Sequence, residues 1–529
     1  MRKPSLLFAS LSVTLCSAAT LCSADAIAAP PAVGETVFET GFETAEARAA
    51  WIAAAFATWD AGFESERALR VTVPAEAAHG SHMVEIPLDV VRYRGCKLGF
   101  TCKARADGAT KPPASWLGVK YMFHVKSKSF GPSWTNEGDV FGTFDWRTLE
   151  FVVVIPPDAE DGVLSLGLQD SAGTVWFDDL RVRVLKPPRP PRPQPIANPP
   201  PAFKGHDLPR LRGAMSPSAF REEDIRVLGR EWNANVIRWQ IVRNWGQAGT
   251  ERDLAEYGRW IDAKLEELDA VLDSCRRHGV KVVIDLHSPP GGRYENKDMA
   301  MFFEKPYQDS FVALWERIAS RFKGHPAVWG YDLVNEPTQT KPSPDGVADC
   351  IGAQVLAAQA IRGIDPATPI FITSGQWGSA EGFRELDPVP ISNVVYQVHF
   401  YSPHEFTHQG VGGEWKPVKY PGTIAGVEWN EARIRAMLQP VREFQLAYNA
   451  HIYVGEFSAA RWAPGAADYL RDCIAVFEDY GWDWTYHAYR EWDGWSLEHV
   501  GDPKNGRRAD TSTDRFEILH SWFKKNKKP

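Results

Sequence analysis

The sequence lacks several features that would indicate particular classes of protein. Downstream of the N-terminus, no stretch stays apolar for the roughly 20 residues that a transmembrane helix needs. The formal net charge is −8, so the chain has no excess of basic residues. We therefore expect neither a membrane-spanning domain nor a nucleic-acid partner.

Cysteine is also scarce, with seven in 529 residues. Cys16 and Cys22 fall in an N-terminal segment that we expect to be removed. The other five are an odd number, so at least one is unpaired. None has the spacing of a zinc site, and we expect each to be a buried small side chain. They are Cys96, Cys102, Cys275, Cys350 and Cys473.

The first 28 residues have the pattern of a secretory signal peptide. Arg2 and Lys3 precede an apolar stretch, and small residues follow it. A lipoprotein anchor needs a small residue before its cysteine, whereas leucine precedes both Cys16 and Cys22. We therefore predict that residues 1–28 are cleaved. The mature protein is expected to be a secreted or periplasmic monomer without membrane contact.

Proline marks a boundary, because nine of the 17 residues from 186 to 202 are proline. Such a segment forms neither a helix nor an interior strand. As polyproline II it would span about 50 Å. We predict a stiff linker here, between one domain at 35–185 and another at 203–529.

Residues 35–185 show short alternating runs such as "RALRVTVP" and "TLEFVVVIP", separated by turn residues. This pattern predicts an all-β jelly-roll or β-sandwich domain. Residues 37–43 and 173–182 resemble the opening and closing strands of jelly-roll carbohydrate-binding modules. In that group acidic residues at these two places often hold a structural calcium ion, the only cofactor that the resemblance implies. Candidates for a sugar platform, with ordinary packing as the alternative, are Trp116, Tyr121, Trp134 and Trp146.

Residues 203–516 alternate strand-like and helix-like segments. Between the second and third strand-like segments, apolar residues recur at spacings of three and four from Leu254 to Leu272, and Gly279 follows. This is the pattern of an amphipathic helix and its end. The strand-like segments are 211–216, 235–240, 281–288, 328–337, 369–375, 393–401, 451–457 and 483–489. Eight strand–helix repeats predict a (β/α)8 TIM barrel, and a doubly wound sheet is the alternative.

Polar side chains end several of these predicted strands. In a TIM barrel the C-terminal strand ends face a shared cleft. Glu336 ends the fourth strand and Glu456 the seventh. Two carboxyl groups in one cleft suit acetal hydrolysis, in which one donates a proton and the other attacks the anomeric carbon. Other polar residues at strand ends, for which core ion pairs or core packing are the alternatives, are Arg238, His287, Asn335, His399 and Tyr401.

Five short motifs in this order resemble glycoside hydrolase family 5, the cellulase-type family of retaining enzymes. They are "VIR" at 236–238, "DLH" at 285–287, "NEP" at 335–337, "HFY" at 399–401 and "GEF" at 455–457. The resemblance implies that Glu336 is the acid/base and Glu456 the nucleophile. It also implies that Arg238 and Tyr401 support the nucleophile. The residues expected to bind the sugar in the cleaved subsite are Asn335, His287 and His399. The implied function is hydrolysis of a β-linked polysaccharide or oligosaccharide, without a catalytic cofactor.

One position departs from this family. A tryptophan usually ends the eighth strand, but His487 occupies that place in "WTYHAYREWDGWS". Trp484, Trp492 or Trp495 is expected to supply the sugar platform instead. We favour Trp492 because it falls beyond the strand, on the loop.

Two other function classes stay open. "HEFTH" at 404–408 matches a zinc-protease motif, which requires a helix that presents both histidines to one metal. Pro403 before it and glycines after it predict a loop, so we expect no metal here. A non-catalytic carbohydrate-binding protein is the other alternative, although both carboxylates are present. The loop at 287–303 resembles those of members that act on short chains or glucoside ends, so exo action also stays open.

Overall fold

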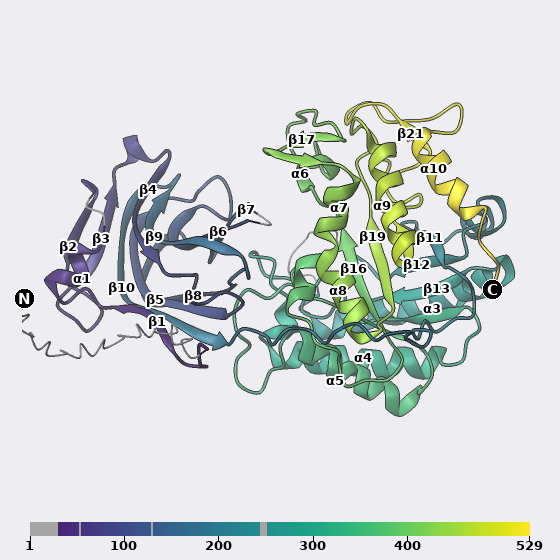
Figure 1. The fold of residues 1–529 in the computed structure, drawn as a ribbon, viewed down its shortest axis with the longest axis horizontal. Coiled ribbons are helices and arrows are strands. Elements are labelled where there is room, and N and C mark those ends of the chain that lie inside the picture. The colour runs from purple at the N-terminus through teal and green to yellow at the C-terminus, as the bar shows by residue number, and fades with distance from the viewer. Residues whose placement is uncertain (1–29, 52–53, 129–130, 244–250) are drawn as a thin grey trace, which may run out of the picture.

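The computed structural model describes residues 30–51, 54–128, 131–243 and 251–529. The predicted signal peptide lies outside the described residues. Figure 1 shows two domains side by side, a β-sandwich that contains the N-terminal part of the chain and a barrel that contains the rest. No helix in the described ranges is both long and apolar enough to cross a membrane.

The N-terminal domain is an antiparallel β-sandwich, as predicted. A six-stranded sheet has the order β2-β3-β10-β5-β8, with β1 also on β10, and it faces a four-stranded sheet of order β4-β9-β6-β7. Side chains alternate between core and surface along β5, as the period of two requires. The strands are β1 Thr36–Thr40, β2 Ala57–Asp60, β3 Ala68–Val73, β4 Ser81–Leu88, β5 Lys97–Ala109, β6 Gly118–Ser127, β7 Gly131–Asn136, β8 Gly142–Val154, β9 Ala159–Gln169 and β10 Gly173–Lys186. Short helices span α1 Ala45–Ala49 and η1 Ala75–Ala77.

The four aromatic platform candidates of this domain lie in different places. Tyr121 is 1% exposed in the core, which leaves no face for a sugar. Trp116 and Trp134 are exposed, and Trp134 stacks on His124 with ring centroids 5.0 Å apart. Trp146 lies on the other sheet. A single platform of all four is therefore ruled out, and sugar binding by the sandwich stays a prediction.

Asp178, in the segment for which calcium was expected, is buried. Its carboxylate accepts hydrogen bonds from the backbone N–H groups of Phe63 and Asp179 and from the hydroxyl of Ser65. These contacts account for three of the roughly four acceptor sites of the carboxylate. A calcium ion at this place stays a prediction.

The proline-rich segment follows the barrel surface instead of holding the domains apart. Arg189 donates a hydrogen bond to the Leu386 carbonyl, and the Arg192 guanidinium lies 5.1 Å from the centre of the Phe444 ring. Asn449 donates to a carbonyl of the segment. The dark-blue trace in Figure 1 accordingly crosses the barrel close to α8. Proline keeps the segment extended, while its arginines attach it to the barrel.

The C-terminal domain is a closed barrel of eight parallel strands, which confirms the predicted TIM barrel and excludes a doubly wound sheet. Each predicted strand is present: β11 Arg212–Met215, β12 Val236–Gln240, β13 Lys281–Asp285, β14 Val328–Asp332, β15 Ile370–Thr373, β16 Val394–Phe400, β19 Ile452–Phe457 and β20 Asp483–Tyr486. Two small hairpins add β17 Gly422–Ile424 with β18 Val427–Trp429, and β21 His499–Val500 with β22 Arg507–Arg508.

Helices surround the barrel. The longest forms as its sequence predicts, because the Asp253 carboxylate caps its first turn and Gly279, at φ 65°, ends it. The helices are α2 Glu222–Arg226, α3 Leu254–His278, α4 Lys305–Phe322, α5 Cys350–Ile364, α6 His404–Thr407, α7 Glu431–Met437, α8 Gln439–Tyr448, α9 Ala466–Tyr480 and α10 Asp514–Phe523. Shorter helical turns are η2 Val227–Glu231, η3 Ala300–Phe302 and η4 Ala380–Arg384. All five cysteines that the structure describes are buried with free thiols, as expected.

The barrel interior changes from apolar to polar along its axis. Trp329, Phe371 and Tyr453 pack edge to face, with ring centroids 4.8 to 5.2 Å apart. Toward the C-terminal strand ends, fully buried Arg238 and Asp332 replace such apolar side chains. Buried charge has to be paired to be tolerated, so this polar layer identifies the functional end of the barrel.

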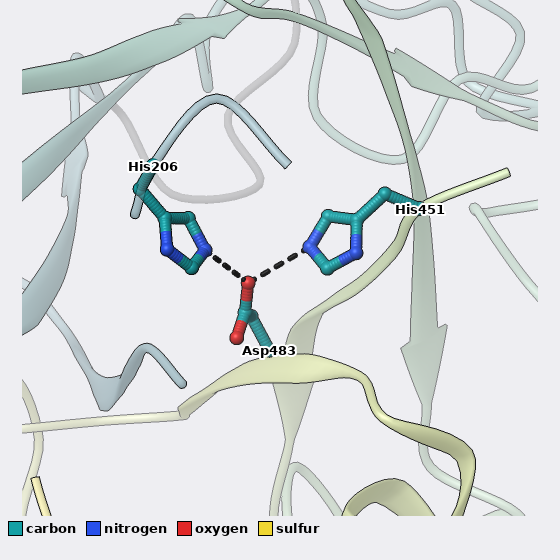
Figure 2. A group of neighbouring side chains, drawn as sticks. All are labelled: His206, His451 and Asp483. Carbon is teal, nitrogen blue, oxygen red and sulfur yellow. Dashed lines mark hydrogen bonds and ion pairs between the residues drawn. The ribbon is translucent and has the colours of Figure 1, made fainter. Parts of the chain in front are cut away.

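A second polar cluster lies at the opposite end, which we call the floor cluster: His206, His451 and Asp483. Figure 2 shows both imidazole rings directed at the carboxylate. Their Nε2 atoms lie 2.7 and 2.8 Å from the same Oδ2 atom, and Oδ1 accepts the N–H of Leu211. Burial alone would raise the pKa of Asp483, but the two histidines outweigh it and hold the pKa below its usual range. This geometry is explained if both imidazoles carry a proton on Nε2 and donate it to Oδ2 of Asp483.

Candidate active site

Seven of the eight predicted site residues meet at the barrel mouth. Glu456 is on β19 and is 4% exposed, and Glu336 follows β14. An oxygen of each carboxylate lies within 4.8 Å of the other. The Nδ1 atom of His399 is 2.9 Å from Oε1 of Glu336 and 3.7 Å from Oε1 of Glu456. The two carboxyl groups therefore face one another across a shared histidine.

Arg238 holds this site from below. It is fully buried, and its guanidinium contacts three carboxylates: Asp332 at 2.7 Å, Glu456 at 2.7 Å and Asp285 at 3.0 Å. Burial disfavours its charge, but these carboxylates outweigh burial and raise its pKa. A further N–H donates to Oδ1 of Asn335 at 3.0 Å. One cation thus fixes the orientation of both the nucleophile candidate and its neighbours.

Glu456 is held in its ionised form. Its Oε2 accepts the Tyr401 hydroxyl at 2.8 Å, and its Oε1 accepts from Arg238. Burial raises the pKa of Glu456, but His399, His487 and Arg238 outweigh burial and lower it overall. Arg238 and Tyr401 therefore contact the carboxylate that they were expected to support.

Asn335 and His287 form the side of the site next to Glu336. The Asn335 amide nitrogen lies 3.0 Å from Nε2 of His287, whose Nδ1 is 2.8 Å from Asp285. These contacts connect the third and fourth strand ends. Both side chains are thus fixed before any substrate arrives, which is favourable for recognition of a sugar hydroxyl.

The loop that carries Glu336 is held in an unusual backbone conformation. Glu336 has φ 46°, in the left-handed region that non-glycine residues rarely adopt. Arg293 donates to the Glu336 carbonyl at 2.8 Å and to the Thr338 hydroxyl at 2.9 Å. Trp377 covers Arg293, whose guanidinium is 4.7 Å from the ring centre. The acid/base candidate therefore has its own positioning residues.

Gly455 explains why the seventh strand reads "GEF". A Cβ atom there would lie 2.3 Å from Oε1 of Gln397 and 2.8 Å from Nε2 of His399. Gln397 in turn donates to Asp332 at 3.0 Å. A side chain at position 455 would displace the groups that orient both carboxylates.

His487, at the position where the family usually has tryptophan, takes part in a chain of hydrogen bonds. Its Nδ1 is 2.6 Å from the Tyr401 hydroxyl and its Nε2 is 2.8 Å from Glu491. Because Tyr401 donates its only proton to Glu456, Nδ1 must also carry a proton, and Glu491 accepts from Nε2. The imidazole is then a cation. Burial disfavours this charge, but Glu491, Glu456 and Glu336 raise the pKa of His487 to about 9.

Trp492 is the eighth predicted residue, and it lies apart from the others. It is 42% exposed and packs edge-on against Trp462 and Trp495. It is not among the residues that line the cleft above the carboxylates. Trp495 packs beside His487, with ring centroids 5.7 Å apart. The position of Trp492 outside this cleft therefore gives no support to its role as a sugar platform.

The "HEFTH" motif, where the flanking residues predicted a loop, forms a single helical turn, α6, and not the long helix of the zinc-protease motif. The rings of His404 and His408 stack 4.0 Å apart. Among the described residues, neither group of three side chains that could share a metal ion includes them. The zinc-protease alternative therefore has no support.

Sequence reasoning missed five residues that shape the site. Charged residues inside otherwise apolar strands were an available signal for two of them, Asp285 and Asp332. Glu491, four residues after His487, could have been found as its partner once the missing tryptophan was noticed. Arg293 and Trp377 lie in loops without a periodic pattern and gave no such signal.

The sequence model of the cellulase family, glycosyl hydrolase family 5, matches residues 201–496, more than half of the chain. The chain belongs to this family. It is a glycoside hydrolase with the (β/α)8 fold, as the five motifs indicated.

Several relatives carry the same domain. Endoglucanase C of Acetivibrio thermocellus is 26% identical over 268 residues, which covers 43% of this chain and 74% of that protein. Cellodextrinase A of Ruminococcus flavefaciens is 29% identical over 245 residues, covering 45% and 68%. Among solved structures, a hyperthermophilic endo-β-1,4-glucanase in complex with substrate is 19% identical, with a TM-score of 0.47, and the match covers 61% of this chain and all of that one.

Proposed function

We propose that the protein hydrolyses a β-linked glycan by double displacement, with Glu456 as the nucleophile and Glu336 as the general acid/base. The observation that carries this proposal is that the two carboxylates face each other closely: one oxygen of each lies within 4.8 Å of the other, and Nδ1 of His399 is 2.9 Å from Glu336 and 3.7 Å from Glu456. Retaining enzymes place these groups about 5 to 5.5 Å apart, whereas inverting enzymes need roughly 6.5 to 9.5 Å to admit a water molecule.

In the first step, ionised Glu456 attacks the anomeric carbon while Glu336 donates its proton to the leaving oxygen. Contacts to Arg238 and Tyr401 keep Glu456 ionised and aimed. The bond to the leaving group breaks as the glycosyl–Glu456 bond forms. Glu336 suits the acid role because its side chain, 22% exposed, reaches the cleft.

In the second step, ionised Glu336 takes a proton from a water molecule that attacks the same carbon. The glycosyl–Glu456 bond breaks, and Glu456 returns as a carboxylate. Two displacements restore the original configuration, so a β-linked substrate gives a β product. Asn335, His287 and His399 are in place to bind hydroxyl groups of the cleaved sugar.

The substrate class that we favour is a β-1,4-linked glucan, cleaved internally. The names of the endoglucanase and cellodextrinase relatives support this choice. The cleft supports it too, because its volume of about 1360 Å³ exceeds the roughly 300–1,000 Å³ of sites for single small molecules. Export to the periplasm or medium, action as a monomer and attachment to polymer by the sandwich domain belong to the same proposal.

Two variants test the mechanism. Glu456→Ala should lose nearly all activity on every substrate, because no glycosyl–enzyme bond can form. Glu336→Ala should keep the first step for aryl glycosides whose leaving group needs no proton. Azide should restore its turnover and give the β-glycosyl azide. Proton NMR of the first sugar formed by the wild-type protein should show the β anomer.

Other outcomes would reject the mechanism. An α anomer as the first product would indicate a single displacement. Equal loss of activity on activated and unactivated substrates in Glu336→Ala, without azide rescue, would remove Glu336 from the acid/base role.

A further inference from the structure

The open edge of the β-sandwich rests on the mouth of the barrel. Strands β7 and β8, the edge strands of the two sheets, face the barrel in Figure 1. The backbone N–H of Val152 on β8 donates to the Thr340 carbonyl at 3.0 Å. Glu137 and Lys341 form an ion pair at 2.8 Å. The barrel loop that follows β14 therefore contacts this edge of the sandwich.

Residues of both domains line one continuous cleft. Its barrel side includes Glu336, Glu456 and His399 together with Trp377, which is 44% exposed. Its sandwich side is formed by Lys97, Ser133, Thr135, Val152 to Val154 and Lys186. The sandwich is therefore a wall of the same space in which the carboxylates lie.

The position of this wall relative to Glu336 shows on which side of the cleaved bond the sandwich lies. As the proposed acid, Glu336 marks the side of the cleft on which the leaving group lies. The loop that carries Glu336 continues directly to Thr340 and Lys341, which contact the sandwich. The backbone N–H of Trp377 donates to the Pro337 carbonyl at 3.2 Å, so the exposed indole lies on this side too. The wall therefore stands beyond the leaving oxygen.

We propose that the edge strands β7 and β8 bind the leaving-group portion of a neutral β-linked glycan, several sugar units beyond the bond that is cleaved. This proposal rests on the proposed function, because it uses Glu336 as the acid. The N-terminal domain is then part of the substrate cleft, in addition to any sugar binding elsewhere on its surface.

The chemistry of this wall suits uncharged sugars. The hydroxyls of Ser133 and Thr135 and the ammonium groups of Lys97 and Lys186 offer hydrogen bonds to sugar hydroxyls. Trp377 offers a flat apolar face between them and the carboxylates. Acidic side chains, including Glu381, also line this end. Charges of both signs along one groove favour a neutral glycan over an acidic one.

A bulky residue at position 133 tests the proposal in the full-length protein. Ser133 is exposed on β7, so Ser133→Trp should fold normally and fill the far end of the cleft. We expect kcat/KM on soluble hydroxyethyl cellulose to fall at least tenfold. On an aryl β-cellobioside, whose leaving group carries no sugar, kcat/KM should stay within twofold. Thr135→Trp repeats the test two residues further along β7, on the same face of the strand.

The matched control is Lys126→Trp, which places the same indole on an exposed position of β6 that does not line the cleft. It should leave both substrates unaffected. Equal kcat/KM of Ser133→Trp and wild type on the polymer, or equal losses on both substrates in variants whose thermal unfolding matches wild type, would overturn the proposal. Absence of wild-type activity on both substrates would instead reject the proposed function.

Discussion

The barrel holds two buried polar clusters that use similar groups in opposite ways. At the floor, one carboxylate, Asp483, accepts hydrogen bonds from two imidazoles and a backbone N–H. At the mouth, one guanidinium, Arg238, serves three carboxylates. The floor carboxylate has three donors to itself, whereas three carboxylates of the mouth share the Arg238 guanidinium.

We infer from this difference that the floor cluster serves stability and that the mouth serves the reaction. Burial together with the neighbouring Asp285 raises the pKa of Asp332 despite its contact with Arg238, so the mouth carries charge that its surroundings do not fully compensate. Such a cluster is tolerated because Glu456 and Glu336 open onto the cleft, where a substrate can use them. The residues of the floor cluster do not line this cleft, and both imidazoles donate to Asp483.

The largest effect is expected from removing the shared cation. Arg238→Ala leaves Asp285, Asp332 and Glu456 buried without their common partner, which should cost about 3–5 kcal/mol of unfolding free energy. Activity should fall at least a hundredfold, about 2.7 kcal/mol in the barrier, because Glu456 loses its orientation. Urea unfolding and kcat/KM on an aryl glycoside measure the two losses. Added guanidinium should restore part of the activity.

Arg212 is the matched control for Arg238. It is also a buried arginine of a barrel strand, but it pairs with Glu478 and contacts none of the mouth residues in the described chain. Arg212→Ala should lower stability and leave kcat/KM unchanged at 25 °C. A similar loss of activity in both arginine variants would mean that the mouth has no special dependence on Arg238.

An intermediate effect is expected at the floor. Asp483→Asn replaces an acceptor of three donors by an amide that accepts fewer, so we expect a loss of about 1–3 kcal/mol in unfolding free energy. Because the folded pKa of Asp483 is lowered, this stability is present above its unfolded pKa of about 3.9 and is lost as pH falls below it. The variant should therefore match wild type in kcat/KM at 25 °C and differ less from it in stability near pH 3. Lost activity at neutral pH would contradict the separation of floor and mouth.

Features that depend on local sequence were predictable. The eight strands and the carboxylates at their ends follow from short motifs, each within a few residues. The pairings among these motifs are not local: Arg238 and Glu456 are 218 residues apart. The resemblance to glycoside hydrolase family 5, together with a shared cleft at the strand ends, made the contact between them predictable.

The attachment of the sandwich to the barrel was not predictable in this way. Arg189 donates to the Leu386 carbonyl, and the N–H of Val152 donates to the Thr340 carbonyl. Every residue has a backbone carbonyl, so the sequence does not indicate which ones accept these bonds. The proline content predicted a stiff linker at 186–202, but that prediction says nothing about what the segment lies against. His487 gave a partial signal, because its departure from the family pattern was noticed while the nearby acidic residue Glu491 was not considered as its partner.

The smallest effect concerns the positive charge that His487 adds to the mouth. A raised folded pKa means that this charge persists above the usual pKa of about 6.5 and is lost as pH rises through about 9. Neutral His487 would then keep its N–H toward Glu491 and accept the Tyr401 proton at Nδ1. Tyr401 would no longer donate to Glu456, and the nucleophile would lose both a hydrogen bond and a cation 3.8 Å away.

The wild-type reaction also depends on the proposed acid Glu336, so the test uses Glu336→Ala with a dinitrophenyl glycoside that needs no acid. In this background the first-step rate should fall about three- to tenfold between pH 8 and 10, which corresponds to about 0.6–1.4 kcal/mol in the barrier. Adding Glu491→Gln should move the decline to lower pH, because Glu491 is the largest favourable influence on the His487 charge. Adding His487→Gln should abolish the decline and leave a constant, lower rate. A decline at the same pH in all three backgrounds would show that the charge of His487 does not act on Glu456.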